Sequence, residues 1–203
     1  IKTILSSILL LDHHTKENIR EDIDEHLACR PAFSQFSHYA PVPGTALWER
    51  MCKENRLIPG IPWEDMHAFH EPWFYHPHFT VKEGKDIQEE AYQRDFHELG
   101  PSVFRLIETE YRGWEYLRHC EKPHLRARAS YFARQMRTYK ILLAAMESLV
   151  PTESMRGMIR NLRIQIEKSF GKINPLYKAA AGGIFLAGRF REFRNRRWGD
   201  VLQ

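Results

Sequence analysis

The spacing of apolar and polar residues changes several times along the chain. The opening run IKTILSSILLL is nearly continuous in apolar residues, which is typical of a parallel strand buried on both faces. The next segment carries apolar residues at every fourth position and predicts an amphipathic helix with one buried stripe, formed by Ile19, Ile23 and Leu27. Residues 32–40 then alternate, which predicts a second strand, and a second helix is predicted over 45–54.

Strand, helix, strand and helix at this spacing predict a βαβα unit with parallel strands and a right-handed crossover. In such units, ligands bind at the carboxyl ends of the strands. Those ends carry the segments LDHHT at 11–15 and YAPVPGT at 39–45. Because the first strand has no polar turn before it, we expect the sheet to continue upstream of Ile1.

The segment YAPVPGT predicts a rigid turn. Pro41 and Pro43 fix their backbone φ angles, Gly44 permits a tight reversal, and Thr45 caps the helix that follows. Such a turn presents backbone carbonyl and amide groups to a flat ligand without bulky side chains. It is equally a stable connection between a strand and a helix, and the residues alone leave both interpretations open.

From residue 86 onward the pattern is helical. Apolar stripes predict helices over 86–99, 102–120, 125–150 and 152–170, and a last helix that begins near residue 175. The stripe on the second of these helices consists of Val103, Leu106, Ile107, Tyr111 and Trp114. The expected domain organisation is βα units over 1–60, a linker or lid rich in aromatic residues and histidines over 61–85, and a helical C-terminal region over 86–203.

The linker or lid contains His67, His70, His76 and His78 within the stretch WEDMHAFHEPWFYHPHF. Imidazole and carboxylate ligands together suit zinc or iron. Two prolines and six aromatic residues interrupt the pattern, however, and favour a loop packed at the mouth of the strands. A third interpretation is a lid whose aromatic surface and titratable histidines contact a substrate. We expect no metal site in this chain.

Composition limits the kinds of binding partner and the cellular compartment that we expect for this chain. The 203 residues include 30 Lys and Arg and 26 Asp and Glu, so the net charge is only +4 and gives little reason to expect nucleic acid as the main partner. No apolar run reaches the ~18 residues of a membrane span. Cys29, Cys52 and Cys120 are too far apart for a disulfide framework or a metal knuckle, and we expect a reducing cytoplasm.

A basic and aromatic segment, RFREFRNRRW at 189–198, follows small and apolar residues near the end of the sequence. This pattern predicts an interfacial helix that contacts anionic lipid through Arg194, Arg196 and Arg197. A dimer contact or a solvated basic face has the same pattern. A helical binding or membrane-surface module without catalysis is therefore one interpretation of the chain, with a peripheral membrane location.

A series of short motifs occurs in the first sixty residues, in the order Asp12, Thr15-Lys16-Glu17-Asn18-Ile19, Ala40-Pro41-Val42-Pro43-Gly44-Thr45, Leu47-Trp48 and Arg56-Leu57. This series resembles the closing part of the core of radical S-adenosylmethionine (SAM) enzymes, in the group that often carries a cobalamin-binding domain upstream. That group has an Asp or Pro after its fifth strand, then a Thr-x-Glu-Asn-Ile-type helix, and Thr-Pro-x-Pro-Gly-Thr after its sixth strand. It often has a glycine near the end of the fifth strand, where this chain has Leu10.

The resemblance implies a fold class: the last βα units of a partial TIM-like barrel, followed by a mostly α-helical C-terminal region. It implies the C-terminal portion of an enzyme that cleaves SAM reductively, for radical-based modification or methyl transfer on a small-molecule or lipid-like substrate. The family holds its 4Fe-4S cluster through a Cys-x3-Cys-x2-Cys motif, which this chain lacks. The cluster ligands are therefore expected outside the chain, the chain alone is expected to be inactive, and cobalamin is expected only with an upstream domain.

The resemblance further implies cofactor-binding residues at the two strand ends, where they shape the pocket over the adenosine or the substrate: Asp12, Tyr39, Pro41, Pro43, Gly44 and Thr45. Asp12 either bonds a ribose hydroxyl or caps its own turn. No residue of the chain is implied as a catalytic group or as a metal ligand.

Overall fold

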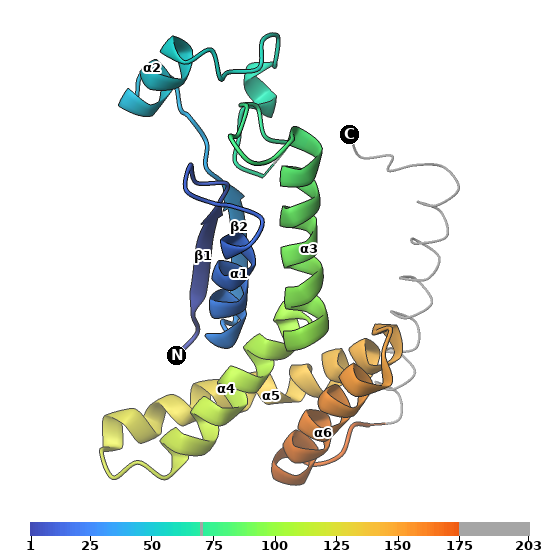
Figure 1. Ribbon diagram of the computed structural model, residues 1–203. Coiled ribbons are helices and arrows are strands. Elements are labelled where there is room, and N and C mark those ends of the chain that lie inside the picture. The colour runs from blue at the N-terminus through green and yellow to red at the C-terminus, as the bar shows by residue number, and fades with distance from the viewer. Residues whose placement is uncertain (70, 175–203) are drawn as a thin grey trace. The chain divides into compact units, whose positions relative to one another are not determined.

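The computed structural model describes residues 1–69 and 71–174. The chain divides into two compact units, Lys2–Arg105 and a second unit that begins at Leu106 (Figure 1). We call them the α/β unit and the helical unit and describe each by itself. Helix α4 begins in the first unit and continues into the second.

The α/β unit confirms the expected α/β start of the chain. Its elements are β1 (Ile4–Leu9), α1 (Asn18–Ala28), β2 (Phe33–His38), α2 (Ala46–Lys53), a 3-10 turn η1 (Trp63–Asp65) and α3 (Val81–Leu99). The two strands pair in parallel, in a register that runs from Ile4 opposite Phe33 to Leu9 opposite His38. The helical crossover between them is α1, as the βαβ pattern predicted.

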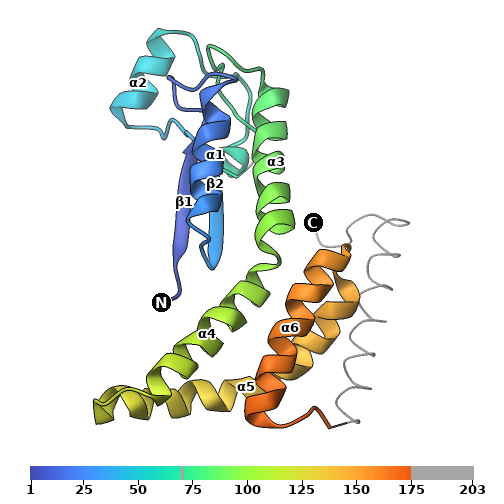
Figure 2. The same ribbon diagram turned by 60° about the horizontal axis from the view of Figure 1, so that its bottom comes forward.

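One face of the two-stranded sheet carries the core. Helix α1 packs on β1, α3 packs on β2, and the two helices contact each other (Figure 2). The predicted stripe of Ile19, Ile23 and Leu27 is buried there with Leu9 and Phe36. Burying these large apolar side chains removes hydrocarbon surface from water and is the main stabilising contribution of the unit.

The other face of the sheet is not covered by any described residue, whereas the sequence predicted a strand buried on both faces. Ile4 is 72% exposed and Ile8 is 50% exposed, whereas Leu9 is fully buried. Burial therefore alternates along β1, because within the described residues α1 and α3 pack on one side of the sheet and nothing packs on the other.

The two edges of the sheet also differ. Phe33 N–H donates to Thr3 O at 3.1 Å and Tyr39 N–H donates to Leu9 O at 2.7 Å. In a parallel ladder this alternation turns the backbone groups of the intervening β1 residues, Ile4, Ser6 and Ile8, away from β2. Among the described residues no strand pairs with this edge of β1.

The outer edge of β2 is closed by side chains of α3. The hydroxyl of Tyr92 accepts from Phe36 N–H at 3.1 Å and donates to Phe36 O at 3.2 Å. Gln88 Nε2 donates to the same carbonyl at 2.8 Å, and His38 N–H donates to Ala68 O at 2.8 Å. A further strand could therefore pair with the free backbone groups of β1. It could not pair with Phe36 of β2, whose backbone groups are already bonded.

Helix α3 begins at Val81, five residues before the expected start at residue 86. Thr80 caps it, and Glu83 completes a capping box by bonding back to Thr80 N–H at 2.8 Å. Because α3 packs on β2, the compact unit runs on to Arg105, past the expected boundaries at 60 and 85.

A buried ion pair fixes the end of α3. Arg105 donates to the two carboxylate oxygens of Asp95 at 2.6 and 2.8 Å, and Ser34 Oγ donates to Asp95 at 2.5 Å. This bidentate pair joins the last turns of α3 to the first turn of α4 and to β2, all within the α/β unit.

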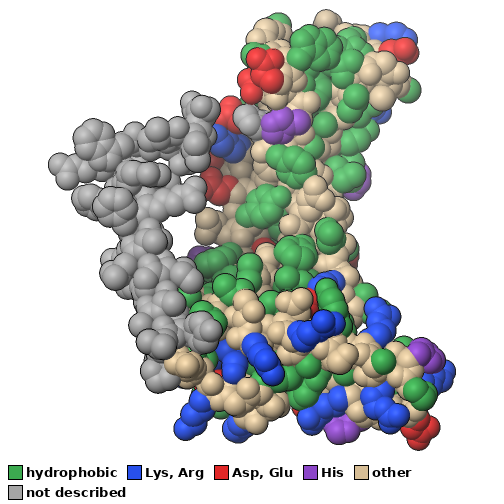
Figure 3. All heavy atoms as spheres, turned by 180° about the vertical axis from the view of Figure 1, so that it is seen from behind, with side chains coloured by type: hydrophobic (Ala, Val, Ile, Leu, Met, Phe, Trp, Pro, Cys, Tyr) green, Lys and Arg blue, Asp and Glu red, His purple; other side chains and the backbone are tan. Residues whose placement is uncertain are grey.

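The helical unit contains the part of α4 (Ser102–Arg118) from Leu106 onward, together with α5 (Pro123–Leu149) and α6 (Glu153–Phe170). The short connection at 150–152 makes α5 and α6 an antiparallel pair. On the face that Figure 3 shows, Lys and Arg side chains are scattered among hydrophobic side chains over the lower part of the picture. Thr152 caps α6 and Gly171, at φ +78°, ends it, as the sequence predicted. On α4 the predicted stripe is correct except for Val103, which is exposed.

Helices therefore dominate the part of the chain after β2, which confirms the expected α-helical region. The last predicted helix and the basic segment with Arg194, Arg196 and Arg197 lie outside the described residues. In residues 1–69 and 71–174, no helix combines the length and the apolar character that crossing a membrane requires.

Candidate functional site

The predicted turn after β2 forms as its residues suggest. Thr45 N–H donates to Val42 O at 3.2 Å, and Gly44 lies at φ +82°, the value that a type II turn requires at its third residue. A Cβ on Gly44 would meet no atom within 4 Å. Glycine is therefore needed here for its backbone conformation and not for space.

Thr45 then starts α2. Its hydroxyl donates to Val42 O at 2.6 Å and accepts from Trp48 N–H at 3.2 Å, which confirms it as the N-cap. The stretch from Val42 to Thr45 is exposed, so its backbone is accessible to a ligand, whereas Pro41 is buried. Tyr39 packs against the core and makes the last backbone bond of the sheet.

Asp12, at the carboxyl end of β1, binds two arginines. Its Oδ1 accepts from Arg56 Nη2 at 2.7 Å and its Oδ2 accepts from Arg50 Nη2 at 2.5 Å. Burial alone would raise the pKa of Asp12, but the hydrogen bonds and charges of Arg56 and Arg50 outweigh burial and lower that pKa. Each carboxylate oxygen accepts one of these bonds, so Asp12 fastens the β1 loop to α2 and keeps an acceptor site on each oxygen for a further donor.

Arg56 extends this brace. Its Nε donates to Tyr75 O at 2.9 Å, and its Nη1 donates to Glu54 at 3.3 Å. Burial lowers the pKa of Arg56, but the hydrogen bonds to Asp12 and Glu54 raise it by more. The loop after β1, helix α2 and the strand-like stretch at Tyr75 are thus fixed to one another by a single guanidinium.

Two histidines hold the backbone of Leu11 beside Asp12. His76 Nδ1 accepts from His78 N–H at 3.1 Å, so its Nε2 carries the proton and donates to Leu11 O at 2.9 Å. His14 Nδ1 accepts from Leu11 N–H at 3.0 Å, and its Nε2 donates to Asp22 at 2.8 Å. Burial lowers the pKa of His76, which keeps the ring neutral in this role.

Leu10 has an unusual backbone conformation that explains why a glycine suits its position. Its φ is +61°, in the left-handed region, and its side chain is buried against α3. A Cβ on Gly84 would lie 2.7 Å from Leu10 Cδ1. The absence of a side chain at Gly84 of α3 therefore makes room for this leucine. The bulk of Leu10 therefore enters the core and leaves the uncovered sheet face free.

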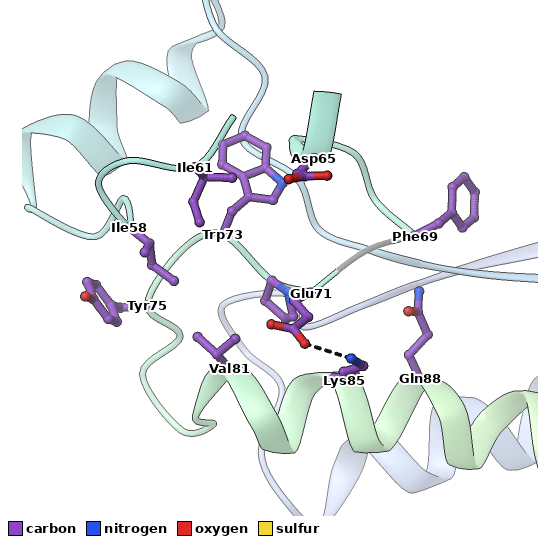
Figure 4. A pocket seen from close by; sticks show the side chains of 11 residues that line it. Ile58, Ile61, Asp65, Phe69, Glu71, Trp73, Tyr75, Val81, Lys85 and Gln88 are labelled. Atoms are coloured by element: carbon purple, nitrogen blue, oxygen red, sulfur yellow. Dashed lines mark hydrogen bonds and ion pairs between the residues drawn. The ribbon is translucent and has the colours of Figure 1, made fainter. Parts of the chain in front are cut away.

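A cavity of about 660 Å³ lies between the 58–75 segment and α3 (Figure 4). Its apolar wall consists of Ile58, Ile61, Phe69, Trp73, Tyr75 and Val81. Lys85 Nζ donates to Glu71 at 2.7 Å in the same wall. Trp63 stacks on Trp48 nearby, with ring centroids 6.5 Å apart. The expected lid segment thus forms an apolar surface beside the strand ends, of a size that accommodates a small molecule.

The histidines of this segment do not form a metal site in the described residues, where no group of three or more His, Cys, Asp and Glu side chains is placed to hold a metal ion. His76 and His78 rings lie 6.0 Å apart between centroids, and His70 lies outside the described residues. The three cysteines are free thiols, and none belongs to such a group. The chain therefore offers no ligand set for an iron–sulfur cluster among its described residues.

The site thus consists of the expected turn together with Arg50, which the sequence did not single out, and with Arg56 and His76, which it named in other roles. Arg50, Arg56 and His76 converge on the loop after β1 from 38 to 65 positions along the chain. The sequence named Arg56 only within the Arg56-Leu57 motif and His76 only as a histidine of the linker or lid, and paired neither with the loop after β1. No protein-family model matches the chain, and neither does any curated protein or solved structure.

Proposed function

We propose that this chain is the C-terminal portion of a radical SAM enzyme, with β1 and β2 as the last two strands of a partial TIM-like barrel. The observation that carries the proposal is the difference between the two edges of the sheet. Tyr92 and Gln88 close the outer edge of β2, whereas the backbone of Ile4, Ser6 and Ile8 is open. A partial barrel requires this arrangement of its final strands, because all earlier strands add on one side.

The uncovered sheet face supports the same proposal. In a βα barrel, helices cover the outer face of the sheet and the inner face surrounds the interior. Helices α1 and α3 cover one face here, so the interior face carries Ser6, Gln35 and Ser37 among apolar neighbours. Ser6 Oγ donates to Gln35 Oε1 at 2.9 Å. Such polar groups in an otherwise apolar interior suit the recognition of a nucleoside or a substrate.

The residues at the strand ends then have positioning roles. The exposed backbone of Pro43, Gly44 and Thr45 fits a flat ligand and forms the pocket wall over the adenosine or the substrate. Tyr39 and Pro41 hold the base of that wall, and Asp12 fixes the neighbouring loop through its arginines. When bound, the 4Fe-4S cluster and SAM supply the radical chemistry, and cobalamin supplies methyl transfer if its domain belongs to the same protein.

The substrate class in this proposal is a small or lipid-like molecule with substantial apolar surface. The aromatic cavity of the 58–75 segment supports it, because its lining is mainly apolar with one ion pair. A cytoplasmic location suits three free thiols, which persist in a reducing compartment.

The test is the coding DNA upstream of the Ile1 codon. The proposal expects an in-frame segment that encodes Cys-x3-Cys-x2-Cys, together with further βα units. A start codon directly before Ile1 would overturn the proposal, because neither the cluster ligands nor the earlier strands would then exist in this protein.

A further inference from the structure

The two units carry opposite net charges. Residues 2–105 contain 11 Lys and Arg against 17 Asp and Glu, a net charge of −6. Residues 106–174 contain 13 Lys and Arg against 7 Asp and Glu, a net charge of +6. The total of +4 therefore hides a strongly basic helical unit, which only the structural division reveals.

Within the helical unit, α5 has an unusual distribution of charge. No acidic residue occurs between Glu121 and Glu147, and Glu147 near the helix end pairs with Arg160 at 2.6 Å. Two exposed arginines on the neighbouring helices have acidic partners: Arg112 donates to Glu108 and Arg156 donates to Glu153, each at 2.7 Å. Arg118, at the end of α4, instead lies over the ring of Trp114, 4.4 Å from its centroid.

Four arginines of α5 differ in this respect, and three of them lie on one face of the helix: the four are Arg126, Arg128, Arg134 and Arg137. Arg126, Arg134 and Arg137 are exposed, and no acidic side chain of the described residues pairs with any of them. Lys140 on the same helix is different, because it is buried and its Nζ donates to Phe170 O and Gly171 O at the end of α6. We call Arg126, Arg134 and Arg137 the arginine stripe.

The arginine stripe lies on one helix face. Positions 126, 130, 134 and 137 follow the spacing i, i+4, i+8 and i+11, so Ser130 completes the row. At 1.5 Å of rise per residue, about 16 Å separates the first arginine from the last. Duplex nucleic acid carries one charge per about 1.7 Å of its axis, so several phosphates lie within reach of the row.

We infer that the arginine stripe binds the phosphodiester backbone of a nucleic acid. Guanidinium groups match phosphate oxygens with two parallel hydrogen bonds, and these three have no competing carboxylate within the described residues. Tyr131, which is 55% exposed beside the stripe, provides a ring on which an unpaired base stacks. This departs from the expectation of no nucleic-acid partner, which rested on the charge of the whole chain.

The residues between the arginines favour nucleic acid over a membrane. On the face of the stripe, Ala127, Ser130 and Ala133 are small and insert no apolar bulk into a bilayer, and Tyr131 beside them is large but carries a polar hydroxyl. An interfacial helix needs large apolar side chains next to its basic residues, because buried hydrocarbon supplies most of its affinity. Phosphate contacts need only cations and hydrogen-bond donors.

The test measures binding of a fluorescent 20-nucleotide single strand and of a 20-base-pair duplex to the 203-residue chain, by anisotropy over a series of KCl concentrations. The stripe variant is R126Q/R134Q/R137Q. The matched control is R112Q/R156Q/R160Q, which removes the same charge from the same unit but from arginines that have acidic partners. Circular dichroism establishes that both variants keep the helix content of the parent.

We expect the stripe variant to bind both nucleic acids at least tenfold more weakly at 100 mM KCl. The slope of log affinity against log salt falls by about 2 to 3, near 0.9 for each lost phosphate contact. The control variant changes affinity less than threefold. Equal affinity of parent and stripe variant, or an equal loss in the control, overturns the inference.

Two competitors complete the test. Vesicles with 30% phosphatidylserine that bind more tightly than nucleic acid would assign the stripe to a membrane and overturn the inference. Polyglutamate that displaces the oligonucleotides at the same charge concentration would assign it to an acidic protein, with the same consequence. Weaker binding of both competitors is the expected result.

Discussion

The hydroxyl of Tyr92 bonds both the N–H and the C=O of Phe36, at 3.1 and 3.2 Å, and so occupies the place of a neighbouring strand. The two rings also pack edge to face, with centroids 5.2 Å apart. Tyr92, together with Gln88 of the same helix, therefore closes the sheet at Phe36 of β2. The open edge of β1 is the structural basis of the proposed barrel.

Replacing Tyr92 with Phe keeps the ring contact but removes the hydroxyl, which leaves Phe36 N–H without its partner. We expect the free energy of unfolding to fall by about 1 to 3 kcal/mol, the usual effect of an unsatisfied backbone donor. Urea denaturation followed by circular dichroism measures it. Tyr116→Phe is the control, because Tyr116 is highly exposed, and we expect a change within about 0.5 kcal/mol there. Equal stability of the parent and Tyr92→Phe would mean that water or Gln88 replaces the hydroxyl.

Alanine at two helical glycines should have opposite effects. At Gly84, a Cβ would lie 2.7 Å from Leu10 Cδ1 and 2.8 Å from Pro72 Cγ, both in the core. We expect Gly84→Ala to destabilise the protein by about 1 to 3 kcal/mol through overpacking. At Gly157 in α6, a Cβ meets no atom within 4 Å, and we expect Gly157→Ala to stabilise by about 0.4 to 1 kcal/mol through helix propensity. Thermal and urea unfolding compare the two, and the same sign for both would contradict the close packing of Leu10 on α3.

The pairing of Asp12 with its arginines predicts a dependence of stability on pH. Its pKa is lowered in the folded state from the ordinary 3.8, so the carboxylate stabilises the fold above pH 3.8. That contribution is lost as the pH falls through the folded-state pKa. We expect Asp12→Asn to lose about 1 kcal/mol at pH 7, since the pair is partly exposed. The difference from the parent should vanish in strong acid.

Urea unfolding at a series of pH values from 7 to 2 checks this dependence. Asp86→Asn on α3 is the control, because no ion pair joins Asp86 to another described residue. A difference between parent and Asp12→Asn that stays constant down to pH 2 would show that the carboxylate charge is not what stabilises the loop.

Two glycines provide a matched test of the proposed role of the turn, in the full-length radical SAM enzyme that the proposal expects. Gly44 and Gly60 have φ values of +82° and +78°, and a Cβ at either would meet no atom within 4 Å. Valine therefore introduces similar backbone strain at both. We expect Gly44→Val to reduce the formation of 5'-deoxyadenosine from SAM at least tenfold, because it distorts the pocket wall. Gly60→Val should change it less than threefold, and iron content should be unchanged in both.

Normal turnover by the Gly44→Val variant would show that the turn is not part of the proposed active site. An equal loss in both variants would attribute the effect to general instability, and it would leave no special role for the YAPVPGT segment.

Local features of the fold followed from the sequence. The stripe of Ile19, Ile23 and Leu27 and the caps Thr45 and Thr152 were predicted correctly. Each depends on neighbours within about one helical turn or one strand, where residue type and spacing decide the backbone conformation. The need for glycine in the turn was of the same kind, since the φ of Gly44 depends only on its own turn.

Features that join distant segments did not follow. The arginines that bind Asp12 and the histidine that binds Leu11 come from segments 38 to 65 positions away, and nothing in the spacing of a single sequence pairs them. Ile4 and Ile8 read as buried because they are apolar, yet burial depends on which helices pack on which face of the sheet. The sequence by itself determined the order of the described helices and strands and the turn after β2, because these are set by local periodicity and capping, although it placed the start of α3 five residues late. Only the tertiary structure decided which edge of the sheet is closed and how charge divides between the two units, because both depend on contacts between residues far apart in the chain.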